Sequence, residues 1–152
     1  MTVSIRTFTK GTVIRLNTKT KIAVIGGDKR FELLTDKFKA DGYDVTGVFH
    51  ENADADFFGA VTDCEILILP LPAVSNGSHI NVSEPYLKHT GADISQIPTL
   101  YELLLKLHKN QLILGGLLPQ WFMDKCQSAG LQAIDYYTSE RLEILTVLPT
   151  VE

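Results

Sequence analysis

The chain has 152 residues, of which 45% are hydrophobic and 21% charged, and its formal net charge is -4. These values predict one globular domain with one hydrophobic core, and the acidic body disfavours a nucleic-acid-binding protein. No stretch approaches the roughly 20 apolar residues that span a bilayer, and the N-terminus lacks the apolar block of a secretion signal. We therefore expect a cytoplasmic protein.

Residues 1–20 differ in charge from the rest of the chain. They contain four basic residues and no acid, whereas the remainder holds 10 basic and 18 acidic residues. Within this leader, residues 12–16 have the β-branched character of a short extended segment. We interpret residues 1–20 as an edge strand or as a tail foreign to the natural protein.

From Lys21 onward, apolar runs of strand length alternate with segments of helical periodicity. The expected strands are residues 21–25, 43–49, 65–69, 111–114 and 131–136. The expected helices are residues 30–40, 54–61, 98–108 and 119–129. This alternation predicts a three-layer αβα sandwich of the Rossmann or flavodoxin-like class, with a mainly parallel sheet of about five strands.

The first of these strands runs directly into Gly26-Gly27-Asp28-Lys29-Arg30. Glycines allow backbone angles that other residues avoid, and the N-terminus of the helix that follows attracts anions. A dinucleotide-binding turn requires G-x-G-x-x-G, whereas this turn has adjacent glycines, no third glycine and an acid where the pyrophosphate would lie. The sequence therefore predicts either a site for a small anion or a structural turn without a ligand, and it disfavours a nicotinamide fingerprint.

Two further features are expected at the same edge of the sheet. Residues 70–78 follow the third strand without a helical pattern, and we interpret them as a ligand-binding or solvated loop. A second glycine pair ends the fourth strand.

The charged residues after the first glycine pair have two interpretations each. The guanidinium of Arg30 suits carboxylates, or it pairs on the surface with Glu32 or Asp28. Asp28 is a candidate acid or base that could equally cap the helix. The expected substrate-binding residues are Gly26, Gly27, Asp28, Arg30, Ser75, Asn76, Gly115 and Gly116.

Cysteine and histidine spacings indicate neither a disulfide framework nor a metal site. Cys64 and Cys126 are far apart and form no C-x-x-C pair, so we expect two buried free thiols. The four histidines show no H-x-x-H or H-E-x-x-H spacing. They are His50, His79, His89 and His108.

Taken in order, four features resemble the N-terminal domain of the A subunit of dipicolinate synthase. They are the segment from Lys21 to Arg30, Leu69-Pro70 before a Ser/Gly loop, Gly115-Gly116, and Pro149-Thr150-Val151-Glu152. The resemblance covers residues 21–152. It implies the substrate side of a two-domain oxidoreductase built like the 2-hydroxyacid dehydrogenases. In spore-forming bacteria, that family makes dipicolinate (pyridine-2,6-dicarboxylate) from a dihydrodipicolinate-type intermediate.

The resemblance also implies an organisation, a cofactor and partners. Residues 21–144 would form the substrate-side domain, and residues 145–152 would begin a linker to an absent NADP-binding domain. We therefore expect no cofactor in this chain and no activity from it alone. The implied partners are the dipicolinate synthase B subunit and a small dicarboxylate, in the mother-cell cytoplasm during sporulation, with no nucleic acid or membrane. Leu145, Val147 and Leu148 predict an exposed apolar surface and self-association.

Two alternatives remain open from the sequence. A stand-alone flavodoxin-like module that binds a small molecule or carries a signal would show the same alternation of strands and helices. Only one acid follows the first strand, which disfavours a phosphoreceiver that would need a paired acidic cluster. A true dinucleotide-binding domain is disfavoured by the missing third glycine.

Overall fold

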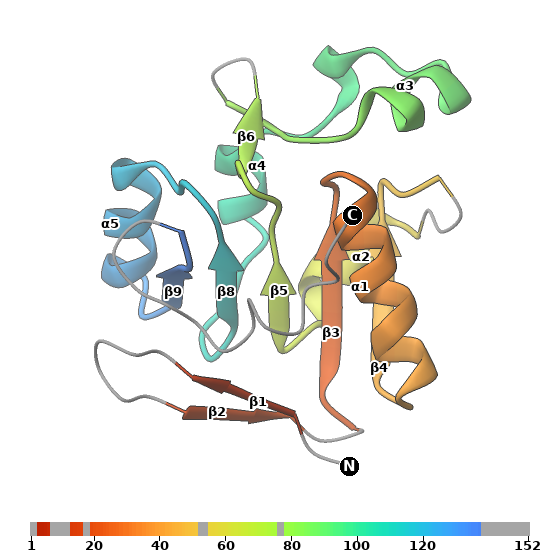
Figure 1. Cartoon of the computed structure of the whole chain (residues 1–152). Helices are drawn as coiled ribbons and strands as arrows, with labels where there is room; N and C mark the ends of the chain where they lie inside the picture. The colour runs from red at the N-terminus through yellow and green to blue at the C-terminus, as the bar shows by residue number, and fades with distance from the viewer. Residues whose placement is uncertain (1–2, 7–12, 17–18, 52–54, 76–77, 138–152) are drawn as a thin grey trace.

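The computed structural model describes residues 3–6, 13–16, 19–51, 55–75 and 78–137 (Figure 1). The central strands are β3 (Lys21–Ile25), β4 (Asp44–Val48), β5 (Ile66–Ile68), β8 (Leu112–Gly115) and β9 (Gln132–Asp135). They form one five-stranded sheet in the order β4-β3-β5-β8-β9, and every neighbouring pair is parallel. The predicted α/β fold is confirmed, with the strand order of flavodoxin-like proteins.

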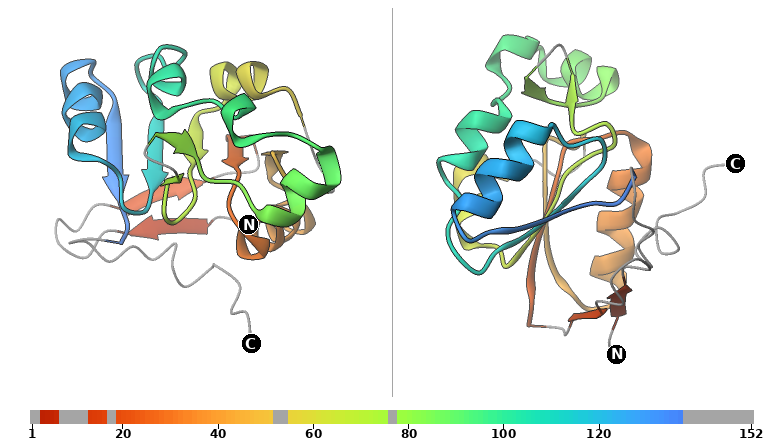
Figure 2. Two further views of the ribbon diagram at one scale, coloured as in Figure 1. Left: turned by 90° about the horizontal axis from the view of Figure 1, so that it is seen from above. Right: turned by 90° about the vertical axis from the view of Figure 1, so that its left-hand side faces the viewer.

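Helices cover both faces of this sheet (Figure 2). One face carries α1 (Lys29–Ala40), and the other carries α2 (Phe57–Asp63), α4 (Leu100–Leu104) and α5 (Gln120–Ser128). A hairpin of β6 (Val74–Ser75) and β7 (His79–Ile80) lies with α3 (Glu84–Thr90) beyond the carboxyl ends of the strands (Figure 1). A short 3₁₀ helix, η1 (Ile94–Gln96), precedes α4.

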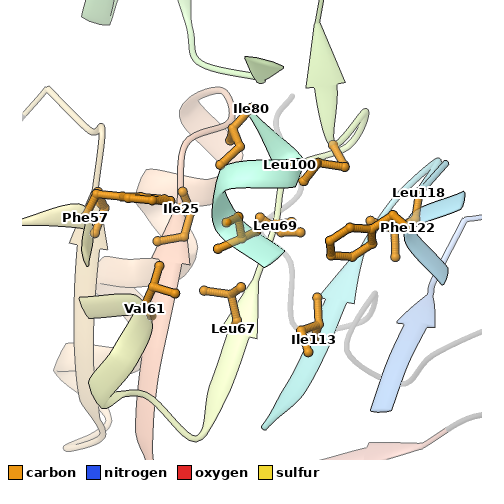
Figure 3. Packing of buried hydrophobic residues seen from close by; sticks show 14 of the residues in the cluster. Ile25, Phe57, Val61, Leu67, Leu69, Ile80, Leu100, Ile113, Leu118 and Phe122 are labelled. Carbon is orange, nitrogen blue, oxygen red and sulfur yellow. The ribbon is translucent and has the colours of Figure 1, made fainter. Parts of the chain in front are cut away.

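Alternate residues of the central strands supply two separate halves of the core. Ala23 and Ile25 of β3 contribute to the cluster under α2, α4 and α5. Ile22 and Val24 contribute to the cluster under α1. Figure 3 shows the first cluster, in which Phe57, Leu100 and Phe122 from three helices meet strand residues such as Ile25 and Leu67. The continuous apolar strands of the sequence are therefore explained by burial on both faces.

Helix α3 was not predicted from the sequence. Its cap is Ser83, whose hydroxyl accepts a hydrogen bond from the N–H of Tyr86 at 3.1 Å. Pro85 lies in the first turn, where the missing N–H of a proline costs no hydrogen bond. A capping serine followed by Glu-Pro was thus an available signal, although the helix has only 7 residues.

Helices α2 and α4 both begin later than we predicted, and both are shorter. Residues 54–61 were expected as a helix, but α2 begins at Phe57, because Asp56 caps it by accepting from the N–H of Gly59 at 2.8 Å. Residues 98–108 were expected as one helix, whereas α4 begins after its cap Thr99 and ends at Leu104.

The leader forms a small sheet of its own. β1 (Val3–Arg6) pairs antiparallel with β2 (Val13–Leu16), and neither belongs to the central sheet. The extended segment predicted at residues 12–16 is therefore present, but it is not an edge strand of that sheet. The residues predicted to drive self-association, Leu145, Val147 and Leu148, lie outside the described residues, as does the expected linker 145–152.

Buried polar contacts join the layers at the amino end of the sheet. Gln111 is buried, and its side-chain amide donates to the carbonyl oxygens of Val61 and Cys64, both at 2.8 Å.

Cys64 and Cys126 are buried free thiols, as predicted. Burial raises the pKa of Cys64 to about 12 and that of Cys126 to about 11. Among the helices described, none is long and apolar enough to cross a membrane.

Candidate functional site

The turn after β3 is held by hydrogen bonds to two separate segments of the chain. The N–H of Gly26 donates to the carbonyl oxygen of Val48 at 2.8 Å, and the N–H of Gly27 donates to that of Asn81 at 2.9 Å. His50 contacts the carbonyl oxygen of Gly26 through Nε2 at 2.9 Å. The turn therefore joins β3 to the end of β4 and to the residues after β7.

Both residues of this turn must be glycine. Gly26 has φ +61° and Gly27 has φ +84°, a region that residues with a Cβ rarely adopt. A Cβ on Gly26 would collide with the carbonyl oxygen of Asn81, and one on Gly27 would lie 2.5 Å from Cδ2 of Phe31. The two glycines thus serve backbone conformation and close packing at once.

His50 supports the turn through its buried ring. Its side chain is only 3% exposed, and because a carbonyl oxygen only accepts, Nε2 carries the proton and donates to Gly26. Burial lowers the pKa of His50, which favours the neutral ring, while Glu32 and Asp36 act in the opposite direction to a smaller extent. Sequence analysis considered this histidine only as a metal ligand, because its partner lies 24 residues away.

Asp28 and Arg30 form a charged pair directly after the turn. Asp28 caps α1 by accepting from the N–H of Arg30 at 3.0 Å, as one of our two interpretations predicted. The guanidinium of Arg30 also donates to both carboxylate oxygens, from Nε at 3.1 and 3.2 Å and from Nη2 at 3.1 Å. The side chains are 35% and 54% exposed for Arg30 and Asp28. Solvent reaches this pair, so the interaction is weak enough to be exchanged for another carboxylate.

Residues 70–82 bridge the two glycine pairs. The N–H of Ala73 donates to the carbonyl oxygen of Gly116 at 2.8 Å, and the N–H of Asn81 donates to that of Ala73 at 3.0 Å. Asn81 in turn accepts from Gly27. In the segment that we expected as a long loop, the described residues are therefore tied to the ends of β3 and β8, and they include strand β6.

The remaining predicted site residues are distributed over this bridge and the end of β8. Ser75 belongs to β6, and its hydroxyl oxygen is buried without a hydrogen-bond partner among the described residues. Asn76 lies outside the described residues. Gly115 ends β8, and Gly116 follows it and donates from its N–H to Pro70.

Tyr136 was missed by the sequence analysis. It follows β9, and its buried hydroxyl donates to the carbonyl oxygen of Leu69 at 3.1 Å. Burial raises the pKa of Tyr136, while the charge of Arg30 lowers it and those of Asp135 and Asp28 raise it to a smaller extent. From the sequence, Tyr136 was part of the expected strand 131–136, and that position indicated only a role in the core.

These contacts define what the edge of the sheet can bind. We expected Gly26, Gly27 and Gly116 to bind substrate, but their N–H groups all donate to carbonyl oxygens within the chain and are therefore not free to bind an anion. The turn also does not fit a pyrophosphate, because those amides are occupied and the carboxylate of Asp28 stands at the N-terminus of α1. A carboxylate can instead reach the half-exposed guanidinium of Arg30.

Metal ligands do not gather here or elsewhere in the part of the chain that the structure describes. In that part, no group of three or more His, Cys, Asp or Glu side chains could hold a metal ion.

Comparison with known proteins identifies the family. The family model of the N-terminal domain of the dipicolinate synthase A subunit matches residues 21–137. The chain belongs to this family. The matched region begins at β3 and ends just after β9, so it contains the complete five-stranded sheet. A search of curated proteins finds no match.

Two solved structures share the fold of this domain. Dipicolinate synthase, A chain, from Bacillus subtilis is 21% identical, with a TM-score of 0.55 over 79% of this chain and 41% of the other. The dipicolinate synthase A subunit from Bacillus halodurans is 11% identical, with a TM-score of 0.52 over 76% of this chain and 40% of the other. The domain described here therefore spans about two fifths of the length of these relatives.

The substitution Gly26→Ala is expected to destabilise the fold by about 2 kcal/mol or more, because it adds backbone strain and a collision with Asn81. Gly91→Ala is the matched control, since Gly91 has φ +71° but no atom within 4 Å of the added Cβ. This control should cost only about 1 kcal/mol. Urea unfolding measures both values, and equal losses would show that the contact with Asn81 is unimportant.

His50 is expected to make stability fall as the pH is lowered. Its pKa is lowered in the folded state, so below about pH 6.5 the unfolded chain takes up a proton that the folded chain does not. Between about pH 7.5 and about pH 5.5 the wild type should therefore lose more stability than His50→Gln, by about 1 kcal/mol. His89→Gln, at an exposed position in α3, is the control and should keep the wild-type slope. Parallel slopes for wild type and His50→Gln in urea unfolding would contradict this role.

Proposed function

We propose that this chain is the substrate-side domain of a dipicolinate synthase. It would take part in NADP-linked formation of dipicolinate from a dihydrodipicolinate-type intermediate during sporulation. Membership of the A-subunit family and the flavodoxin-like sheet support this proposal. The observation that carries it is the forked guanidinium of Arg30 at the edge of the sheet where ligands of open α/β proteins bind.

Arg30 would anchor a substrate carboxylate by exchanging its partner. In the described structure its guanidinium already holds one carboxylate, that of Asp28, through two nitrogen atoms. A substrate carboxylate matches the same fork, and the half-exposed position lets it compete with Asp28. Asp28 would keep its capping bond to the N–H of Arg30 during this exchange.

The remaining candidates would contribute from other segments at the carboxyl ends of the strands. Ser75 offers a hydroxyl without a described partner, and Asn76 follows it in the chain. Gly115 and Gly116 let the end of β8 approach the 70–82 bridge. This approach would position the side chains of Ser75 and Asn76 over the substrate. Asp28, once released by Arg30, would be the candidate acid or base beside the ring.

We further propose that NADP and the dipicolinate synthase B subunit act from outside the described domain. The occupied amides of the Gly26-Gly27 turn support a nucleotide site in another domain. The B subunit as partner and the mother-cell cytoplasm as location follow from the family resemblance. Since both Bacillus relatives are longer than this chain, no reaction step is assigned to it alone.

One alternative is favoured by a specific observation. The strand order β4-β3-β5-β8-β9 is that of stand-alone flavodoxin-like modules, which bind small molecules at the same edge. Such a module would not recognise dipicolinate through Arg30, so binding of dipicolinate separates the two proposals.

Calorimetric titration with dipicolinate tests the role of Arg30. We expect saturable binding that weakens by about tenfold in Arg30→Ala and less in Arg30→Lys, which keeps the charge but loses the fork. Lys29→Gln is the matched control, because it removes one positive charge from the same helical turn. Wild-type affinity in Arg30→Ala, or no binding at all, would contradict the proposed substrate site.

A second titration concerns the nicotinamide nucleotide. The chain is expected to bind NADPH weakly or not at all, because the Gly26-Gly27 amides are used internally and Asp28 repels phosphate. Adding NADPH to the protein in a calorimeter should give no saturable heat. Micromolar affinity would place the nucleotide on this chain and favour a dinucleotide-binding domain.

A further inference from the structure

A hollow lies at the opposite edge of the sheet from the glycine turns. It has a volume of about 450 Å³ and lies where α4 and α5 end, beside the entries to β8 and β9. This volume falls in the range of small-molecule sites, roughly 300–1,000 Å³. Its lining residues are Leu104, Leu107, His108, Lys109, Lys125, Ser128, Ala129 and Leu131.

The lining of this pocket includes a cluster of leucines. Leu131 is buried in the core beneath α2, α4 and α5, and Leu104 and Leu107 are half-buried against the same core. These three side chains therefore offer a branched aliphatic surface that is continuous with the interior. Such a surface favours the apolar part of a ligand, because contact removes hydrocarbon from water.

Basic side chains provide the other part of the lining. Lys109 and Lys125 are exposed and line the pocket, and no Asp or Glu belongs to the lining residues that the structure describes. The ring of His108 is fixed between the carbonyl oxygens of Thr62 and Lys109, at 2.9 and 3.0 Å. This local positive charge contrasts with the net charge of -4 for the whole chain.

We propose that this pocket binds a small amphiphilic carboxylate, an anionic head attached to an aliphatic or aromatic body. The leucines would hold the body, and the two lysines would hold the carboxylate by charge-assisted contacts at the entrance. The leucines exclude a neutral polar ligand, because its polar groups would lose their hydration against an apolar surface. The lysines exclude a cation, because they repel positive charge. The pocket is distinct from the carboxylate site at Arg30, on the other edge of the sheet.

Octanoate at concentrations where it is monomeric is the probe, and amide chemical shifts of the 152-residue chain in NMR are the readout. We expect saturable shifts confined to the ends of α4 and α5 and to residues 107–109 and 128–131. Octanol, with the same body but no charge, should bind about fivefold more weakly. Equal affinity for octanol would overturn the proposed recognition of the carboxylate.

Paired lysine variants test the same point without touching the core. Lys109→Gln combined with Lys125→Gln should weaken octanoate binding by about fivefold. The matched control combines Lys37→Gln with Lys39→Gln, which removes the same charge from the exposed last turn of α1. Equal weakening in the control would overturn the proposal by showing that net charge alone attracts the anion. Binding to anionic lipid vesicles without binding of monomeric octanoate would also overturn it.

Discussion

The left-handed turn at Gly26-Gly27 is the constraint on which the arrangement at the carboxyl ends of the strands depends. Three of its backbone hydrogen-bonding groups are committed to Val48, Asn81 and His50, so one turn fixes β3 against β4 and against the 70–82 bridge. These contacts occur at the switch point between β3 and β5, where the chain leaves the sheet in opposite directions. The geometry of the neighbouring side chains follows from this turn.

Asp28 and Arg30, which follow this turn, are joined by two kinds of hydrogen bond with different roles. The capping bond from the N–H of Arg30 to Asp28 fixes the start of α1. The bonds between the two side chains are solvent-exposed and contribute little to stability, which leaves the guanidinium available to a ligand. Tyr136 is held separately, because its buried hydroxyl donates to the carbonyl oxygen of Leu69 at 3.1 Å.

The centre of the sheet was predictable because β3, β5 and β8 are short apolar runs that need burial on both faces, as Ile22 and Ala23 illustrate. The cap of α1 was predictable for a similar reason, since Asp28 and Arg30 are close in sequence. The partners of the turn and the contact made by Tyr136 were not predictable from the sequence. Asn81 uses its backbone, which carries no side-chain signal, and Tyr136 reaches Leu69 across 67 residues of sequence. Tertiary hydrogen bonds of this kind become visible only when the strands are arranged.

Burial of the two thiols has a consequence for redox chemistry. Disulfide exchange and alkylation require the thiolate, and pKa values of about 12 for Cys64 and about 11 for Cys126 leave almost none at neutral pH. Cys64 follows α2 and Cys126 lies within α5, so both belong to the same helical layer. Both thiols are therefore poorly reactive in the folded chain, and modification of either one would report that its burial under the helical layer has been lost.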